Sequence, residues 1–248
     1  MDAIKLEGLT KRYRDVLAVD ELSLCIKQGE LFSLLGVNGA GKTTTIKMLS
    51  CLTEPTDGDA YLLGKSIRKQ AAEVKSLIAV SPQETAVAPG LSVRENLELM
   101  CGVHGFTRDK QRAKIDELTA LLGLESVIER KAGKLSGGWQ RRLSIAMALI
   151  SEPRILFLDE PTSGLDPATA DEIQKMILAE KEKGKTIFLT THTMAEAEKL
   201  CDNIALLNEG NIVEYGSPEE ICRRYNHQKR ISSIRVRTDT SYDISARL

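Results

Sequence analysis

The chain of 248 residues has no excess of charge of either sign and no long apolar run. Its 34 basic residues are balanced by 35 acidic ones, so no overall field favours nucleic acid or an anionic membrane surface. The longest apolar runs have about six residues, as in 145–150, whereas roughly 20 are needed to span a bilayer. No basic stretch followed by an apolar one indicates an export signal. We therefore expect a cytosolic protein with one core, or one core with a satellite subdomain.

Cysteine is scarce and scattered. The five cysteines form an odd set without any C-x-x-C pair, so neither a disulfide framework nor a zinc site is expected. We expect them to behave as small buried apolar residues. They are Cys25, Cys51, Cys101, Cys201 and Cys222.

Short apolar segments that lead into polar residues predict an α/β fold with a largely parallel sheet. Residues 31–35 read as a buried strand that ends at Gly36. Residues 155–158 end in two carboxylates, and residues 186–190 lead toward His192. Because open α/β sheets bind ligands at the carboxyl ends of their strands, we expect these polar residues to share one site.

Capping sequences mark several helix starts. Three have Ser or Thr followed three residues later by Glu, namely Ser92–Glu95, Thr193–Glu196 and Ser217–Glu220. Asp166 followed by Pro167 predicts another N-cap, with proline at the first helical position.

Helical patterns are concentrated between about 88 and 150, which predicts an inserted helical subdomain. Residues 2–30 and 57–80 carry shorter alternating patterns and predict a small antiparallel sheet beside the main core. We expect one domain over 1–225. Residues 226–248 are expected to form a C-terminal tail or the start of a further segment.

The segment from Cys222 to Arg237 contains six basic residues and no acidic one. This composition favours a solvated tail over a contact with a membrane surface or a partner.

The segment Gly36-Val37-Asn38-Gly39-Ala40-Gly41-Lys42-Thr43 has the spacing of a phosphate-binding loop and predicts a nucleotide-binding enzyme. Its glycines let backbone N–H groups face the phosphates, where side chains would collide. The helix expected to begin near Lys42 adds its positive end. Lys42 is expected to reach the β- and γ-phosphates. The Thr43 hydroxyl is expected to bind Mg²⁺, and Thr44 to add a phosphate contact.

Two adjacent carboxylates end the predicted strand 155–158. Asp159 fits the carboxylate expected beside a phosphate loop, which meets Mg²⁺ either directly or through one of the ion's own ligands. Glu160 would face the γ-phosphate and orient or deprotonate the attacking water. Together the two residues predict a hydrolytic site.

A second anion site is predicted at Leu135-Ser136-Gly137-Gly138-Trp139. The turn presents a hydroxyl and free backbone N–H groups at the start of a helix expected over 139–150. The phosphate loop already binds an anion in this chain. Within a single chain, the turn at Ser136 therefore has no anion left to bind.

In this order, the motifs resemble the nucleotide-binding subunits of ATP-binding-cassette (ABC) proteins, over roughly residues 2–225. The resemblance implies a P-loop NTPase with a RecA-like, mostly parallel sheet, which binds ATP and Mg²⁺. It also implies a dimer, with two identical chains expected. In that dimer Ser136, Gly137 and Gly138 close on the γ-phosphate held by the opposite subunit, so no single copy contains a complete active site.

Four further positions match the family one at a time. Gln83, after an expected strand at 77–80, resembles the glutamine that meets Mg²⁺ or the water and links the site to a membrane partner. The loop that ends at Asp166 resembles the one that crosses the dimer interface. His192 resembles the histidine that contacts the γ-phosphate, and Tyr13 the aromatic residue that stacks on adenine.

Two positions depart from the family pattern. Val37 stands where proline is common, and Trp139 stands where glutamine usually follows Ser-Gly-Gly, with Gln140 one place later. The runs 161–167 and 191–198 look most like exporters of the drug-resistance and sodium-extrusion type.

The first hypothesis is therefore an ATPase subunit that dimerises on ATP and drives a separate integral membrane permease from the inner face of the cell membrane. A second hypothesis is an ABC ATPase that acts on nucleic acid or ribosomes. The single cassette and the balanced charge argue against it, so no nucleic-acid partner is expected. A third, an interaction module without turnover, would need a lost catalytic residue, and each expected one is present.

Overall fold

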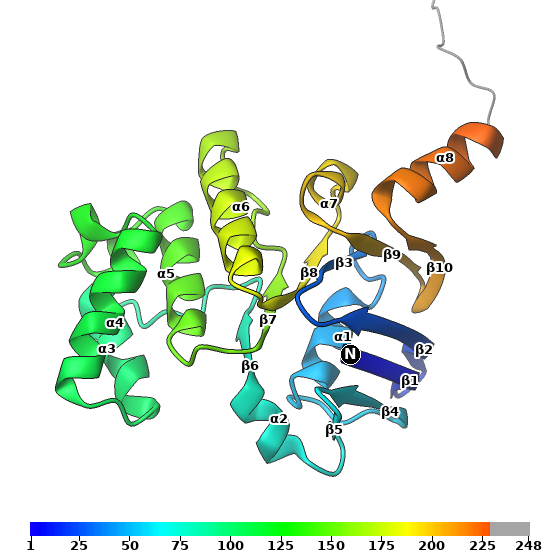
Figure 1. The fold of residues 1–248 in the computed structure, drawn as a ribbon, viewed down its shortest axis with the longest axis horizontal. Helices are drawn as coiled ribbons and strands as arrows, with labels where there is room; N and C mark the ends of the chain where they lie inside the picture. Colours follow the sequence, from blue (N-terminus) through cyan, green and yellow to red (C-terminus); the bar gives the residue numbers. More distant parts are fainter. Residues whose placement is uncertain (229–248) are drawn as a thin grey trace, which may run out of the picture.

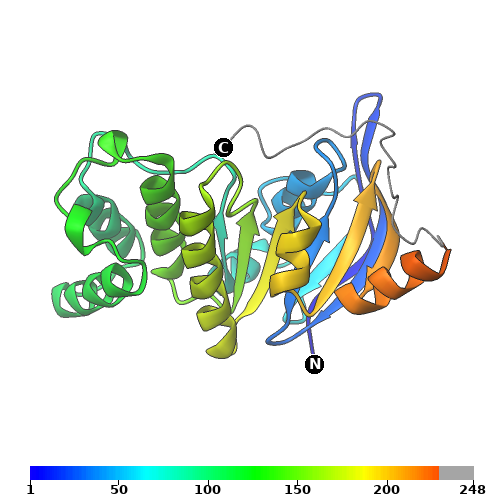
Figure 2. The same cartoon turned by 90° about the horizontal axis from the view of Figure 1, so that it is seen from above.

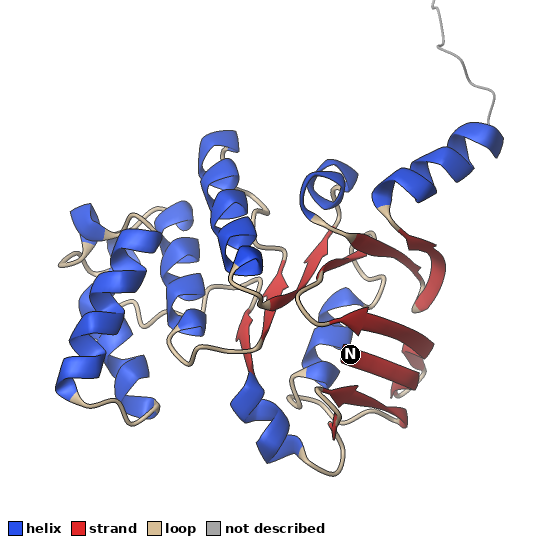
Figure 3. Ribbon diagram, viewed as in Figure 1, coloured by secondary structure: helices blue, strands red, loops and turns tan. Residues whose placement is uncertain are grey.

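The computed structural model describes residues 1–228, which form two sheets flanked by helices (Figures 1 and 3). The strands of the larger sheet are β3 (Leu31–Leu35), β6 (Ile78–Ser81), β7 (Ile155–Asp159), β8 (Thr186–Thr191), β9 (Asn203–Asn208) and β10 (Asn211–Gly216). Their order is β10-β9-β3-β8-β7-β6, and each neighbouring pair is parallel except β9 and β10. The predicted α/β fold with a mostly parallel sheet is therefore confirmed.

A smaller antiparallel sheet lies beside this core, as predicted from residues 2–30 and 57–80. Its strands are β1 (Asp2–Tyr13), β2 (Val16–Lys27), β4 (Asp57–Leu62) and β5 (Lys65–Ser66), in the order β2-β1-β4-β5. The end of the second predicted range differs. Residues 71–77 form α2 (Ala71–Leu77), and β6 joins the larger sheet because it pairs in parallel with β7.

The segment 88–150 is mostly helical and projects at one end of the molecule, opposite the end that carries the last helix (Figure 2). It contains α3 (Val93–Val103), α4 (Arg108–Leu121), α5 (Gly137–Leu149) and short 3-10 turns at Glu125–Val127 and Ala132–Lys134. The other helices are α1 (Lys42–Leu49), α6 (Pro167–Glu182), α7 (Met194–Leu200) and α8 (Pro218–Gln228).

The larger sheet is buried on both faces. In β3, Leu31 and Leu35 belong to the core under α5, α6 and α7, whereas Phe32 and Leu34 belong to the core that includes α1 and the antiparallel sheet. Because alternate residues enter two cores, the strand is apolar almost throughout.

The structure bears out three of the four predicted helix caps. Ser92 and Glu95 exchange both hydrogen bonds of a capping box, as do Ser217 and Glu220, and Asp166 accepts from the Thr169 N–H.

Thr193 is the N-cap residue of α7, as predicted, but the capping box predicted there does not form. The Thr193 side chain makes no cap hydrogen bond, and its own N–H donates to the Thr191 hydroxyl at 3.1 Å. Glu196 turns away from the helix start and accepts a hydrogen bond from Thr162 instead.

The predicted division at residue 225 falls inside α8, which continues to Gln228. The rest of the predicted tail, 229–248, lies outside the described residues, as does most of the basic segment. Within residues 1–228, no helix combines the length and apolarity needed to cross a bilayer. The five cysteines are free thiols, of which Cys101 and Cys201 are buried and the others half-buried.

Candidate nucleotide site

The loop between β3 and α1 has the shape that its glycines predict. Gly39 and Gly41 have φ angles of 84° and 111°, in the left-handed region that side chains disfavour. A Cβ atom at Gly36 would lie 2.5 Å from the Leu207 carbonyl oxygen, and one at Gly41 would collide with that of Ala18. No side chain caps the first turn of α1, so its N–H groups face a ligand position at the positive end of the helix.

A pocket of about 280 Å³ lies at this loop. Six residues predicted to hold phosphate line it together with residues from three other segments: Asn38, Gly39, Gly41, Lys42, Thr43 and Thr44, with Ala18, Gln83 and Glu160. Gly36 and Ala40, also predicted, are not among the described residues that line it. Sequence-distant residues of the predicted site therefore share one pocket.

Lys42 is buried at the floor of this pocket. Its ammonium donates to the carbonyl oxygens of Gly36 and Val37 at 2.7 and 3.2 Å and lies 3.2 Å from the Glu160 carboxylate. An ammonium group has three N–H donors, and three oxygens surround this one. An incoming phosphate oxygen would therefore compete with Glu160 for Lys42.

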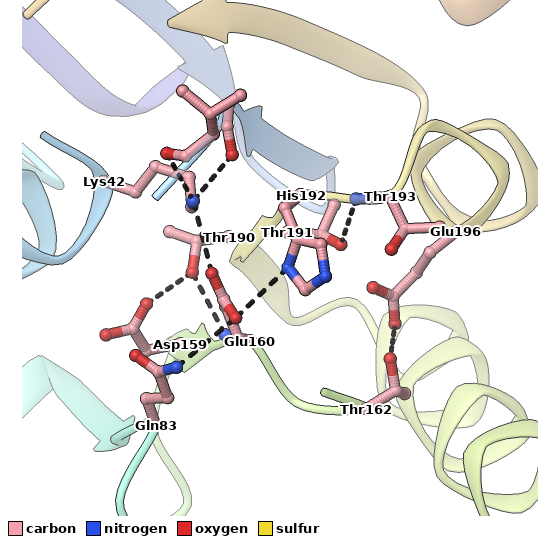
Figure 4. A network of polar contacts seen from close by, with 12 residues as sticks. Lys42, Gln83, Asp159, Glu160, Thr162, Thr190, Thr191, His192, Thr193 and Glu196 are labelled. Carbon is pink, nitrogen blue, oxygen red and sulfur yellow. Dashed lines mark hydrogen bonds and ion pairs between the residues drawn. The ribbon is translucent and has the colours of Figure 1, made fainter. Parts of the chain in front are cut away.

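Side chains from three other segments of the chain contact the Glu160 carboxylate (Figure 4). Lys42 approaches one oxygen, while the Gln83 amide and His192 Nδ1 approach the other at 3.4 and 3.3 Å. The predicted catalytic residues Gln83, Glu160 and His192 are thus brought together.

Asp159 is held on both of its oxygens. The Thr43 hydroxyl donates to Oδ2 at 2.8 Å, and the Thr190 hydroxyl donates to Oδ1. Because the Thr43 hydrogen is used on Asp159, the lone pairs of its oxygen stay available to a cation. The predicted metal residues Thr43 and Asp159 are therefore in contact.

Arg141 is a residue of this site that sequence reasoning missed. From α5, its buried guanidinium donates to the carbonyl oxygens of Pro82, at 2.6 Å, and Gln83. Burial lowers the pKa of Arg141, while the nearby Asp159 and Glu160 carboxylates oppose that shift. The fork fixes the backbone that carries Gln83, and nothing in an arginine on an amphipathic helix indicates such a role.

The turn at Ser136 lies apart from the pocket. Ser136 is the exposed N-cap of α5 and makes no side-chain cap hydrogen bond; neither it, Gly137 nor Gly138 is among the described residues that line the pocket. A Cβ atom at Gly138 would lie 2.7 Å from the Thr169 methyl group, so α6 requires a glycine there.

The residues that follow this turn contact α6 and the loop that precedes α5. The Arg142 guanidinium lies 4.8 Å from the centre of the Trp139 ring and also pairs with Glu172 of α6. The Gln140 amide donates to the carbonyl oxygens of Ala132 and Leu135 at 3.1 and 3.3 Å. Trp139 therefore has a packing partner of its own, and Gln140 holds the preceding loop.

Two other predicted residues lie away from the pocket. Tyr13, at the end of β1, is 43% exposed, with the Lys11 ammonium 5.0 Å from its ring centre. Asp166 caps α6, and its hydrogen bonds from the Thr169 N–H and hydroxyl lower its pKa.

The mostly parallel sheet, the phosphate loop and the paired carboxylates define a P-loop NTPase. Comparison with known proteins gives the particular group. The family described as ABC transporter matches residues 19–163, and the chain belongs to this family. It is an ATP-binding and ATP-hydrolysing subunit of an ABC transporter.

Two relatives illustrate its position in the family. The Nod factor export ATP-binding protein I of Burkholderia pseudomallei is 42% identical over 215 residues, which cover 87% of this chain and 71% of that protein. A probable multidrug ABC transporter ATP-binding protein of Escherichia coli is 39% identical over 218 residues, which cover 88% of this chain but 38% of the relative.

Solved structures agree with the fold. The structure of cbiO1 from Clostridium perfringens, described as part of the ABC transporter complex cbiONQ, has a TM-score of 0.81 and 28% identity and covers 92% of this chain and 95% of its own. A dimeric ATP-binding cassette in a post-hydrolysis state, bound to ADP and Pi, has a TM-score of 0.79 and 28% identity, with coverages of 87% and 98%.

Proposed function

We propose that two copies of this chain sandwich ATP between the phosphate loop of one and the Ser136 turn of the other, and that this closure drives an exporter permease. One observation carries the proposal: the chain has two helix starts suited to an anion, at Lys42 and Ser136, and the second does not line the pocket of the first. A second copy supplies the missing half of the site. The dimeric form of a similar cassette supports this arrangement.

Within each half-site, Lys42, Glu160 and His192 carry the chemistry. A γ-phosphate that takes over the Lys42 ammonium would release Glu160 to accept a proton from the attacking water. His192 and Gln83, which already lie on the same Glu160 oxygen, would orient the carboxylate and that water. Thr44 and the N–H groups of residues 38, 39 and 41–43 would hold the remaining phosphate oxygens, whereas the Ala40 N–H already donates to the Val37 carbonyl oxygen at 3.2 Å.

The donors near Asp159 fit Mg²⁺. A hydroxyl, a carboxylate and the free amide oxygen of Gln83 are hard oxygen ligands, and few protein ligands suffice because phosphates complete the shell. Bound there by Thr43, Asp159 and Gln83, the ion would neutralise charge on the transferred phosphoryl group. We assign adenine stacking to Tyr13, whose exposed ring stands at the end of β1.

An apolar groove beside Gln83 suits the permease. It is lined by residues of β6, of the segment that follows β6, of α3 and of α5, among them Ala79, Pro82, Met100 and Met147. Arg141 donates to the carbonyl oxygens of both Pro82 and Gln83, so a displacement of Pro82 in the groove would also move the backbone of Gln83. We propose that a short apolar helix of an integral membrane permease docks here. The chain would then lie on the inner face of the cell membrane, and the names of its exporter relatives support export.

Replacing Glu160 by Gln tests this function. The variant should bind ATP as the wild type does, accumulate ATP-dependent dimers and lose at least about 100-fold in phosphate release. The exposed Glu129→Gln serves as a matched control and should keep full turnover. Undiminished hydrolysis by the Glu160 variant would contradict the assignment of the base.

A further inference from the structure

Thr190 occupies a central position in the large sheet. It lies in β8, between the strand that leads into the phosphate loop and the strand that ends in Asp159. Its side chain is completely buried, and it pairs directly with Asp159 across the parallel ladder. No ligand can reach it there, so any role in hydrolysis must act through its neighbours.

The Thr190 hydroxyl makes two hydrogen bonds of opposite direction (Figure 4). It accepts from the Glu160 backbone N–H at 3.1 Å and donates to Asp159 Oδ1. The direction is fixed because an N–H can only donate, which leaves the hydroxyl hydrogen for the carboxylate. The Thr190 hydroxyl oxygen thus connects the carboxylate of Asp159, proposed to bind Mg²⁺, with the backbone of Glu160, the proposed base.

The backbone at Glu160 needs such support. Its φ angle is 48°, in the left-handed region that residues with a side chain adopt at an energetic cost. The Glu160 N–H also donates to the Thr190 carbonyl oxygen at 3.1 Å, so Thr190 supplies both of its acceptors. The turn in the chain there aims the Glu160 carboxylate toward Lys42, Gln83 and His192.

We propose that Thr190 is a positioning residue for ATP hydrolysis, whose hydroxyl sets the geometry of Asp159 and Glu160 together. This inference rests on the proposed function of those two carboxylates. A residue that merely packs the sheet would act through its volume. Thr190, by contrast, is expected to act through its oxygen.

Three substitutions distinguish an effect of the Thr190 hydroxyl oxygen from an effect of the Thr190 side-chain volume. Thr190→Val keeps the shape and removes the hydroxyl, Thr190→Ser keeps the hydroxyl, and Thr190→Ala differs from the serine variant only by that oxygen. Thr186→Val is the matched control, since Thr186 is a buried threonine at the other end of β8 whose hydroxyl accepts from the Gly29 N–H at 3.0 Å.

The measurements are phosphate release against ATP concentration, and binding of ATP with Mg²⁺ and with excess EDTA. Thr190→Val should lower kcat by about 10- to 100-fold with KM for ATP changed by less than about threefold. It should also reduce the gain in affinity that Mg²⁺ provides, within the same limit of about threefold, while binding in EDTA stays at the wild-type level. The Thr190→Ser and Thr186→Val variants should keep kcat within about threefold of wild type.

The proposal is overturned if Thr190→Val retains the wild-type kcat, or if Thr190→Ser loses as much as Thr190→Val. Should the valine variant fail to fold by circular dichroism, the serine and alanine variants decide, and equal kcat values for them overturn it. Failure of the proposed function has a different signature: the wild type would not hydrolyse ATP, or Glu160→Gln would hydrolyse it undiminished.

Discussion

The Thr162 hydroxyl donates a hydrogen bond of 2.5 Å to the buried carboxylate of Glu196 (Figure 4). Thr162 lies two residues after Glu160, in the loop that leads to Asp166, and Glu196 lies in the helix that follows His192. The bond therefore joins the loop expected at the dimer interface to the segment that carries the histidine. This contact links two segments that carry predicted site residues, Asp166 and His192.

Thr162→Val should reduce kcat by about 3- to 10-fold without altering ATP affinity, because it frees the loop but leaves the pocket intact. Glu196→Ala should cost about as much, and the double variant no more than either alone, since both remove the same bond. Steady-state phosphate release gives these values. Thr107→Val, at a helix start where the hydroxyl makes no cap hydrogen bond, is the control. Additive losses in the double variant would show that the two residues act separately.

Arg141→Ala should destabilise the fold by about 3 kcal/mol, because it leaves the partly buried carbonyls of Pro82 and Gln83 without their donor. Arg141→Lys keeps the charge but replaces the planar fork by a single nitrogen, which holds the two carbonyls in a less fixed geometry. It should therefore lower kcat while most of the free energy of unfolding is retained. Urea unfolding and phosphate release measure the two effects. The exposed Arg130→Ala should change neither. An Arg141→Lys variant with full turnover would refute the role of the fork.

Glu180 gives a prediction for pH. Burial alone would raise the pKa of this 2% exposed carboxyl, but hydrogen bonds from Lys183 and Lys185 outweigh it and lower the pKa. The unfolded chain then binds the proton more readily than the folded one. The stabilisation is therefore complete above the unfolded pKa near 4.5 and is lost as pH falls through the folded value.

Glu180→Gln should lower the free energy of unfolding by about 1–2 kcal/mol at pH 7. The gap to wild type should narrow as pH falls below the unfolded pKa near 4.5 and close as pH falls through the lower folded pKa. Urea titrations between pH 7 and 3 measure it. The exposed Glu219→Gln should differ little from wild type at any pH. A gap for Glu180→Gln that stays constant down to pH 3 would contradict the ionic origin of the stabilisation.

Features that depend on residues close together in the sequence were predicted correctly. The phosphate loop, the buried strands and the caps at Ser92 and Asp166 depend on neighbours within a few residues, so spacing alone predicts them. The error at Thr193 has the opposite cause. The Thr-x-x-Glu pattern is present at Thr193, but the Thr193 N–H donates to the Thr191 hydroxyl, and Glu196 accepts from Thr162. Thr162 lies in the loop after β7, far from Thr193 in the sequence.

Contacts across the sheet could not be predicted in this way. Thr190 meets Asp159 only because β8 pairs with β7 in one register, and Arg141 reaches Gln83 only because α5 packs against β6. Thr190 is the last but one residue of β8, so a rule that pairs the last residues of neighbouring strands would have selected Thr191 instead. No local signal marks Arg141.

The most direct test of a site shared between two chains is to mix two inactive variants. Lys42→Ala removes the phosphate contact, and Ser136→Glu places a negative charge at the turn expected to face the phosphate. Each homodimer then has two broken sites. A mixed dimer regains one intact site, built from Lys42 of one chain and Ser136 of the other. Phosphate release by an equimolar mixture should therefore recover to about a quarter of the wild-type rate. A mixture as inactive as its two components would contradict the shared site.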